Sequence, residues 1–122
     1  MLPQILLVES NGTLMALLLG LLHASGYAVT LAGGFDDAAT RVKEGDFHAL
    51  VTAHHLGTHN GLHLIVRARA QHPLIRCVVT SPIADGVLEA EASGLGAMCV
   101  IAPWRDGTQL LKILAPGGLQ RA

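Results

Sequence analysis

The sequence predicts an α/β domain with a five-stranded parallel sheet between helices. Short apolar runs of strand length alternate five times with segments whose apolar residues recur at helical spacing. The strand runs are apolar at consecutive positions, which is typical of strands buried on both faces. At 122 residues, about half of them apolar, the chain is long enough for one such domain and too short for two ordinary ones.

The first strand is expected at residues 4–8, and polar residues follow it. Asn11 can cap a helix, and Gly26 suits the left-handed turn that ends one. Leucines recur between them at helical spacing: Leu14, Leu17, Leu18, Leu21 and Leu22. A second strand over residues 27–31 follows, and Asp36 and Asp37 favour the start of a helix that runs to about Glu44.

The third strand is expected at residues 47–53, followed by a helix over about residues 61–71. The residues spaced for the buried face of that helix are Leu62, Ile65, Val66 and Arg69. The remaining elements are strand 74–80, helix 87–93, strand 97–101 and helix 108–114, separated by glycine and proline.

This alternation favours the flavodoxin-like (βα)5 arrangement, with sheet order 2-1-3-4-5. A site in such a sheet lies outside the carboxyl ends of the strands, above all the first and third, because the strand order reverses between them. The residues placed there are Glu9, Ser10, Ala53, Ser81 and Ala102.

Four local motifs add to the spacing of strands and helices. They are ILLVES at residues 5–10, Asn60-Gly61, VVTS at residues 78–81 and Ala102-Pro103-Trp104. Over residues 5 to about 114 the chain resembles the receiver domain of bacterial two-component response regulators. The resemblance implies that Glu9 keeps one acid of the magnesium-binding pair, that Ser10 replaces the other, and that Ser81 is the hydroxyl beside the phosphoryl group.

The resemblance also locates two losses. Counting back eight residues from Gly61 reaches Ala53, where the family has its phosphoacceptor aspartate. Ala102 stands where the family has a lysine, and Cys99 where it has a switch aromatic. Phosphorylation of an aspartate needs a carboxylate nucleophile, a metal and a cation that holds the product. We therefore expect a degenerate receiver that is not phosphorylated at the usual site, is not an enzyme and needs no cofactor.

Receivers act through partners, so the resemblance implies a protein partner or a homodimer. The expected face is formed by the fourth helix, fifth strand and fifth helix, about residues 86 to 114, and includes Leu88, Cys99, Trp104 and Leu111. The alternative is a flavodoxin-like small-molecule or metal-binding domain with a relined crevice. A receiver-like domain is expected over residues 1–115, with 116–122 as a C-terminal tail or linker stub. The chain could also be one domain of a larger regulator.

Composition argues against several other classes of function. The net charge is −1 and the basic residues are scattered, so neither nucleic-acid nor membrane-surface binding is expected. The apolar run 14–22 is too short to span a bilayer, and the first basic residue is Arg41, which favours a cytoplasmic protein over a secreted one. Cys77 and Cys99 are expected to be free buried thiols.

Histidines are concentrated in one stretch: His54, His55, His59 and His63. Metal binding, a pH-sensitive loop and ordinary exposed loop histidines are all open, and the last is favoured because Asn60-Gly61 separates His59 from the helix.

Other polar and aromatic candidates also carry two interpretations. Thr52 should point away from the site of Ala53, because neighbouring strand residues face opposite sides. For Ser81, a structural hydrogen bond is favoured over a role as a nucleophile. For Glu9, a carboxylate that pairs locally is favoured over a retained metal ligand. Trp104 is either part of the core or an anchor in a protein contact.

Overall fold

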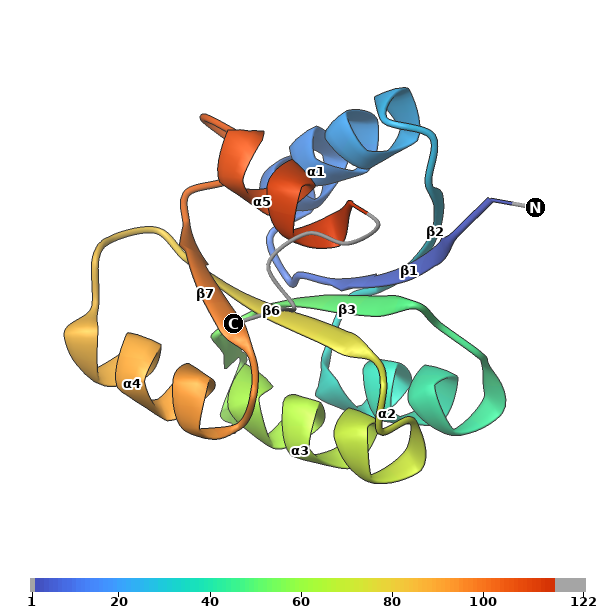
Figure 1. The fold of residues 1–122 in the computed structure, drawn as a ribbon, viewed down its shortest axis with the longest axis vertical. Helices are drawn as coiled ribbons and strands as arrows, with labels where there is room; N and C mark the ends of the chain where they lie inside the picture. Colours follow the sequence, from blue (N-terminus) through green and yellow to red (C-terminus); the bar gives the residue numbers. More distant parts are fainter. Residues whose placement is uncertain (1, 116–122) are drawn as a thin grey trace.

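The computed structural model describes residues 2–115, which form a parallel five-stranded sheet between two layers of helices (Figure 1). The strands of this sheet are β1 (Gln4–Val8), β2 (Ala28–Ala32), β3 (Ala49–Ala53), β6 (Arg76–Ser81) and β7 (Met98–Ile101). The helices are α1 (Gly12–Ala24), α2 (Phe35–Glu44), α3 (Gly61–Gln71), α4 (Gly86–Gly94) and α5 (Thr108–Leu114). The strand order is β2-β1-β3-β6-β7, which confirms the predicted flavodoxin-like topology.

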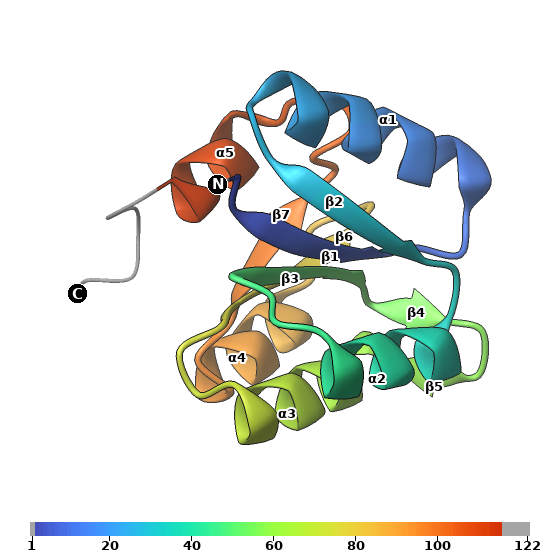
Figure 2. The same cartoon turned by 90° about the vertical axis from the view of Figure 1, so that its right-hand side faces the viewer.

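Helices α1 and α5 cover one face of the sheet, and α2, α3 and α4 cover the other (Figures 1 and 2). Each face has its own hydrophobic core, and β1 contributes to both. Ile5 and Leu7 pack in the core on the side of α1 and α5, whereas Leu6 and Val8 pack in the core on the other side. This alternation follows from the two-residue period of a strand, and it explains why the strand is apolar at every position.

Side-chain caps begin three of the helices. Asn11 Oδ1 accepts a hydrogen bond from the Leu14 N–H at 3.0 Å, as its position before the first helix predicted. Asn60 Oδ1 accepts from the Leu62 N–H at 2.9 Å, and Asp85 Oδ1 accepts from the Leu88 N–H at 3.0 Å. Each cap satisfies a backbone donor that has no partner within its helix.

The structure departs from the sequence prediction in the middle of the chain. A short hairpin of β4 (His55–Leu56) and β5 (His59–Asn60), which was not predicted, separates β3 from α3 (Figure 2). Strand β3 begins at Ala49, two residues later than expected. Val66 is 50% exposed and does not belong to the buried face of α3. It follows Ile65 by about 100° around the helix, and Leu64 and Ala68 occupy the buried face instead.

Within residues 2–115, none of the helices combines the length and apolar character that a membrane span requires.

Candidate functional site

The carboxyl ends of β1, β3 and β6 meet at one edge of the sheet and enclose a crevice of about 290 Å³. Its lining residues are Glu9, Leu14, Ala53, His54, His55, Thr80, Ser81, Pro82, Ile83, Asp85 and Trp104. Three of the five predicted site residues are therefore in the wall of the crevice. Ser10 is exposed and Ala102 is buried, and neither lines it.

Backbone contacts hold the tip of β3 in place. The His54 N–H donates to the Thr80 carbonyl at 3.2 Å, and the Gly61 N–H donates to the His54 carbonyl at 2.7 Å. A Cβ atom on Gly61 would overlap the Ala53 carbonyl oxygen and lie 3.0 Å from Thr52 Oγ1. The first turn of α3 thus rests directly on the end of β3, and only glycine allows this approach.

Ala53 presents a methyl group at the tip of the central strand and is 8% exposed. A methyl group can neither attack a phosphoryl donor nor ligate a metal. Thr52 next to it is fully buried and donates its hydroxyl to the Ala53 carbonyl at 3.0 Å, and it does not line the crevice. Its hydroxyl is therefore not available to a ligand in the crevice.

Ser81 is buried and its hydroxyl is engaged with the backbone that follows. Its Oγ donates to the Ile83 carbonyl at 2.7 Å and accepts from the Ile83 N–H at 3.4 Å. These bonds shape the turn after β6 and correspond to the structural role favoured from the sequence.

Glu9 is the buried carboxylate of the crevice, with 6% of its surface exposed. Its Oε2 accepts a hydrogen bond from the Asn11 N–H at 3.0 Å, so its contact is local. Asp85, which the sequence pattern did not single out, adds a second carboxylate to the wall. Its position as the N-cap of α4, just after the fourth strand of the sheet, is the signal that could have identified it.

Ala102 has a φ of +44°, the only positive value among the non-glycine residues from 2 to 115. Its N–H donates to the Ser81 carbonyl at 2.8 Å, and its carbonyl accepts from the Arg105 N–H at 2.9 Å. The backbone therefore makes a strained turn at the position where the family resemblance expects a lysine.

The clustered histidines separate in the structure. His54 and His55 lie with their rings 4.3 Å apart and both line the crevice. Burial, together with the neighbouring His55, lowers the pKa of His54, and the opposing effects of Asp85 and Glu91 are smaller. The neutral imidazole is therefore favoured at neutral pH.

His59 belongs to the hairpin, not to an irregular loop. Its ring stacks on Phe35 at 4.6 Å, and the guanidinium of Arg67 lies 5.2 Å from the centroid of the same Phe35 ring. His63 is exposed on α3. The histidine cluster thus divides between the crevice, an aromatic stack and the surface.

The resemblance to receiver domains implies a magnesium ion in this crevice, but the side chains that line it do not fit one. Among the residues that the structure describes, no three His, Cys, Asp or Glu side chains are grouped closely enough to hold a metal ion. Magnesium requires near-octahedral oxygen coordination, whereas this crevice offers Glu9 and the capping carboxylate Asp85.

The predicted partner face differs in detail from the expectation. Leu88 is 1% exposed, because it lies on the side of α4 that faces the sheet, so it cannot contact a partner. Cys99, Trp104 and Leu111 are half-buried and pack on the two cores. The exposed apolar side chains of this region are Ile83, Val87, Met98 and Ile101, with 70%, 72%, 36% and 42% of their surfaces exposed.

Both cysteines are free, as predicted, but only Cys77 is fully buried. Burial raises the pKa of the Cys77 thiol to about 11, and it also raises the pKa of the half-buried Cys99. Neither thiol is activated as a nucleophile.

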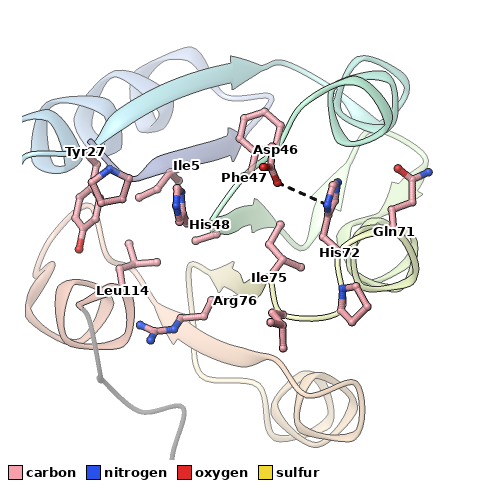
Figure 3. A pocket seen from close by; sticks show the side chains of 14 residues that line it. Ile5, Tyr27, Asp46, Phe47, His48, Gln71, His72, Ile75, Arg76 and Leu114 are labelled. Atoms are coloured by element: carbon pink, nitrogen blue, oxygen red, sulfur yellow. Dashed lines mark ion pairs between the residues drawn. The ribbon is translucent and has the colours of Figure 1, made fainter. Parts of the chain in front are cut away.

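A larger pocket of about 570 Å³ opens at the opposite edge, where the strands begin (Figure 3). Tyr27, Phe47, Ile75 and Leu114 line it with His48 and His72, and His72 Nδ1 lies 3.9 Å from Asp46 Oδ1. The Arg76 guanidinium in its wall donates to the Ile113 and Ala115 carbonyls. This pocket lies away from the strand ends at which flavodoxin-like sheets bind ligands.

The sequence matches no family model and no curated protein. Solved structures do match closely. The chemotaxis protein CheY4 of Vibrio cholerae superimposes with a TM-score of 0.83 at 14% identity, covering 94% of this chain and 100% of that one. The chain has the fold of a response-regulator receiver domain. In this fold the strand order reverses between β1 and β3, which explains why the crevice forms at the carboxyl ends of these strands.

Two further receiver structures are more similar in sequence. A response regulator from Burkholderia pseudomallei, which carries a phosphorylated aspartic acid and a calcium ion, has a TM-score of 0.83 at 25% identity over 94% of this chain and 68% of its own. The receiver domain of an HD-domain-containing protein from Pseudomonas fluorescens has a TM-score of 0.81 at 26% identity, over 93% of this chain and 92% of its own.

Proposed function

We propose that the chain is a receiver-like domain of a two-component signalling system that acts through protein association and is not phosphorylated at the usual position. The observation that carries the proposal is Ala53, a methyl group at the tip of β3 in the wall of the crevice. In the receiver structure from Burkholderia pseudomallei the phosphorylated group is an aspartic acid. This crevice presents alanine at the end of its central strand.

The rest of the crevice supports the same conclusion. Phosphoryl transfer to a carboxylate is catalysed by a metal and by cations that stabilise the developing charge. The side chains that line the crevice include neither lysine nor arginine, and its donors do not fit magnesium. The lining therefore has no carboxylate at the end of β3, no set of oxygens that fits magnesium, and no lysine or arginine, and all three features support a domain that does not carry out the phosphorylation reaction.

The apolar side chains near α4 and β7 support a role in association. Val87 and Ile101 leave 72% and 42% of their surfaces in contact with solvent, although burying such side chains is favourable by about 1.5–3 kcal/mol each. We propose that the face formed by α4, β7 and α5 contacts a protein partner or a second copy of the chain. β7 is also an edge strand, since it pairs with β6 alone in the sheet.

Sedimentation velocity over a range of concentrations tests this proposal. The association, with itself or with a candidate partner, should be the same with and without acetyl phosphate and magnesium. Val87→Ser combined with Ile101→Ser should weaken it. Val66→Ser should not, because it changes a side chain that is also exposed, at 50%, but lies on α3, outside this face. Association that appears only after treatment with acetyl phosphate would contradict the proposal.

A further inference from the structure

The crevice at the carboxyl ends of the strands carries negative charge without a compensating cation. Glu9 and Asp85 are in its wall, and none of the side chains that line it is a lysine or arginine. Neither carboxylate forms an ion pair with any residue from 2 to 115. A ligand that enters this crevice therefore meets a negative potential.

Glu9 is the strongest part of this field, because 94% of its surface is removed from water. Its Oε2 accepts one hydrogen bond, from the Asn11 N–H at 3.0 Å, and its Oε1 accepts none from the described residues. Among the described residues no fully buried side-chain oxygen lacks a hydrogen-bond partner, so the free Oε1 of Glu9 is open to solvent. Because Glu9 lines the crevice, a cationic donor there could pair with its carboxylate.

The remaining walls suit an organic cation better than a hydrated one. Leu14, Ala53 and Ile83 contribute apolar surface, and Trp104 contributes an aromatic side chain. Cations are attracted to the faces of indole rings. The neighbouring His54 is held in its neutral form at neutral pH, so it does not oppose a positive charge.

We propose that this crevice binds a small primary amine in its protonated form, with the ammonium group at Glu9, the carbon chain against Trp104, and the charge of Asp85 in the same wall adding to the attraction. An ammonium group has three hydrogen-bond donors and no acceptor, which matches a wall of carboxylate oxygens. A divalent cation would need more oxygen ligands than the crevice offers. The volume of about 290 Å³ is at the lower end for small-molecule sites, so the amine carries only a few carbons.

The inference deepens the proposed function and rests on it in one respect, since a phosphoryl group in the crevice would compete for the same space. The ligand of the crevice would then be an ammonium group, carried either by a free amine or by a lysine side chain of a partner protein. Both present the same ammonium chemistry, and the experiment below separates them.

Titration of the purified chain with n-butylammonium chloride tests the proposal, with the fluorescence of Trp104, the single tryptophan, as the readout. A saturable change is expected. Potassium chloride at matched ionic strength and 1-butanol should not reproduce it, because the first lacks the carbon chain and the second the charge. A change that either control reproduces would overturn the proposal, as would saturable binding of magnesium chloride that displaces the amine.

Matched variants locate the binding. Glu9→Gln should weaken butylammonium binding by about ten- to a hundredfold, the range for a hydrogen bond to a charged group. Asp85→Asn should weaken it by a smaller factor while keeping the cap of α4, since asparagine caps helices equally well. Glu44→Gln, which removes the same charge from the exposed end of α2, should have no effect. Equal dissociation constants for the Glu9→Gln and Glu44→Gln proteins would overturn the assignment.

If circular dichroism shows that Glu9→Gln does not fold, the Asp85→Asn variant decides in its place, and an unchanged affinity overturns the proposal. Putrescine and Nα-acetyl-lysine N-methylamide then distinguish the two sources, and tighter binding of one identifies a free amine or a protein side chain. A phosphoryl adduct after acetyl phosphate treatment would overturn the proposed function without deciding this titration. Failure of the amine to bind would overturn this inference alone.

Discussion

Replacing Gly61 by alanine tests the contact that places Ala53 at the tip of β3. The new Cβ would overlap the Ala53 carbonyl oxygen and lie 3.0 Å from Thr52 Oγ1. Strand β3 cannot retreat, because it is paired with β1 on one side and β6 on the other. The first turn of α3 must therefore shift, and overpacking of this kind costs about 1–3 kcal/mol. Alanine recovers only part of the roughly 1 kcal/mol that it gains at an interior helix position, because Gly61 is the first residue of α3, so the expected net loss is about 1–2 kcal/mol.

Urea unfolding followed by circular dichroism measures this loss. Gly20→Ala is the matched control, because Gly20 lies in α1, is exposed, and has no atom within 4 Å of the position its Cβ would take. The control should gain up to about 1 kcal/mol of unfolding free energy. If Gly61→Ala were as stable as the parent, or gained as much as Gly20→Ala, then α3 would not rest on the end of β3. The alignment that places Ala53 at the phosphoacceptor position, eight residues before Gly61, would then lose the structural contact that supports it.

Three further predictions concern the thiols, one histidine and one strained residue. Burial raises the pKa of Cys77 to about 11, so a thiol reagent at about pH 8 should label the half-buried Cys99 well before Cys77. Mass spectrometry measures the two labelling rates, and equal rates would contradict the burial of Cys77. His54 has a lowered pKa when folded, so the unfolded chain binds its proton more readily, and this residue should cost the protein stability as the pH falls through 6.5. The unfolding free energy of the parent minus that of His54→Asn should therefore decrease between about pH 7.5 and pH 5.5, and a constant difference would refute the shift. Ala102→Gly should raise the unfolding free energy by up to about 1 kcal/mol, because a positive φ costs alanine about that much more than glycine, and a loss of stability would show that the turn is not strained.

Most of the fold could be predicted because its signals are local. Consecutive apolar residues marked the buried strands, as in β1, where Leu6 faces one core and Leu7 the other. Asn11 and Asn60 marked helix starts through side chains that cap them directly. The parallel order then followed from the alternation of strands and helices, which permits few topologies.

The errors arose where tertiary contacts decide the outcome. The hairpin that holds His55 and His59 has no alternating apolar pattern, and it forms between β3 and α3, where His59 stacks on Phe35 of α2. Val66 is apolar and spaced plausibly, yet α3 turns Leu64 and Ala68 toward the sheet. When a helix has apolar residues on several sides, its sequence alone does not specify which side packs against the sheet.

The candidate site was predicted in part for the same reason. Strand ends determine where Glu9, Ala53 and Ser81 lie, so the topology was enough to bring these three together. Asp85 and His54 reach the crevice from the segments that follow the strands, and their orientation depends on the turns after β3 and β6. The electrostatic character of the crevice could therefore be described only from the three-dimensional arrangement.

The intact mass of the chain after incubation with acetyl phosphate and magnesium tests the central claim most directly. With alanine at the tip of β3 and no cation among the side chains that line the crevice, the mass should remain that of the unmodified protein. A stoichiometric increase equal to one phosphoryl group, stable in acid and lost in base, would show that another carboxylate accepts phosphate and that the crevice retains the reaction.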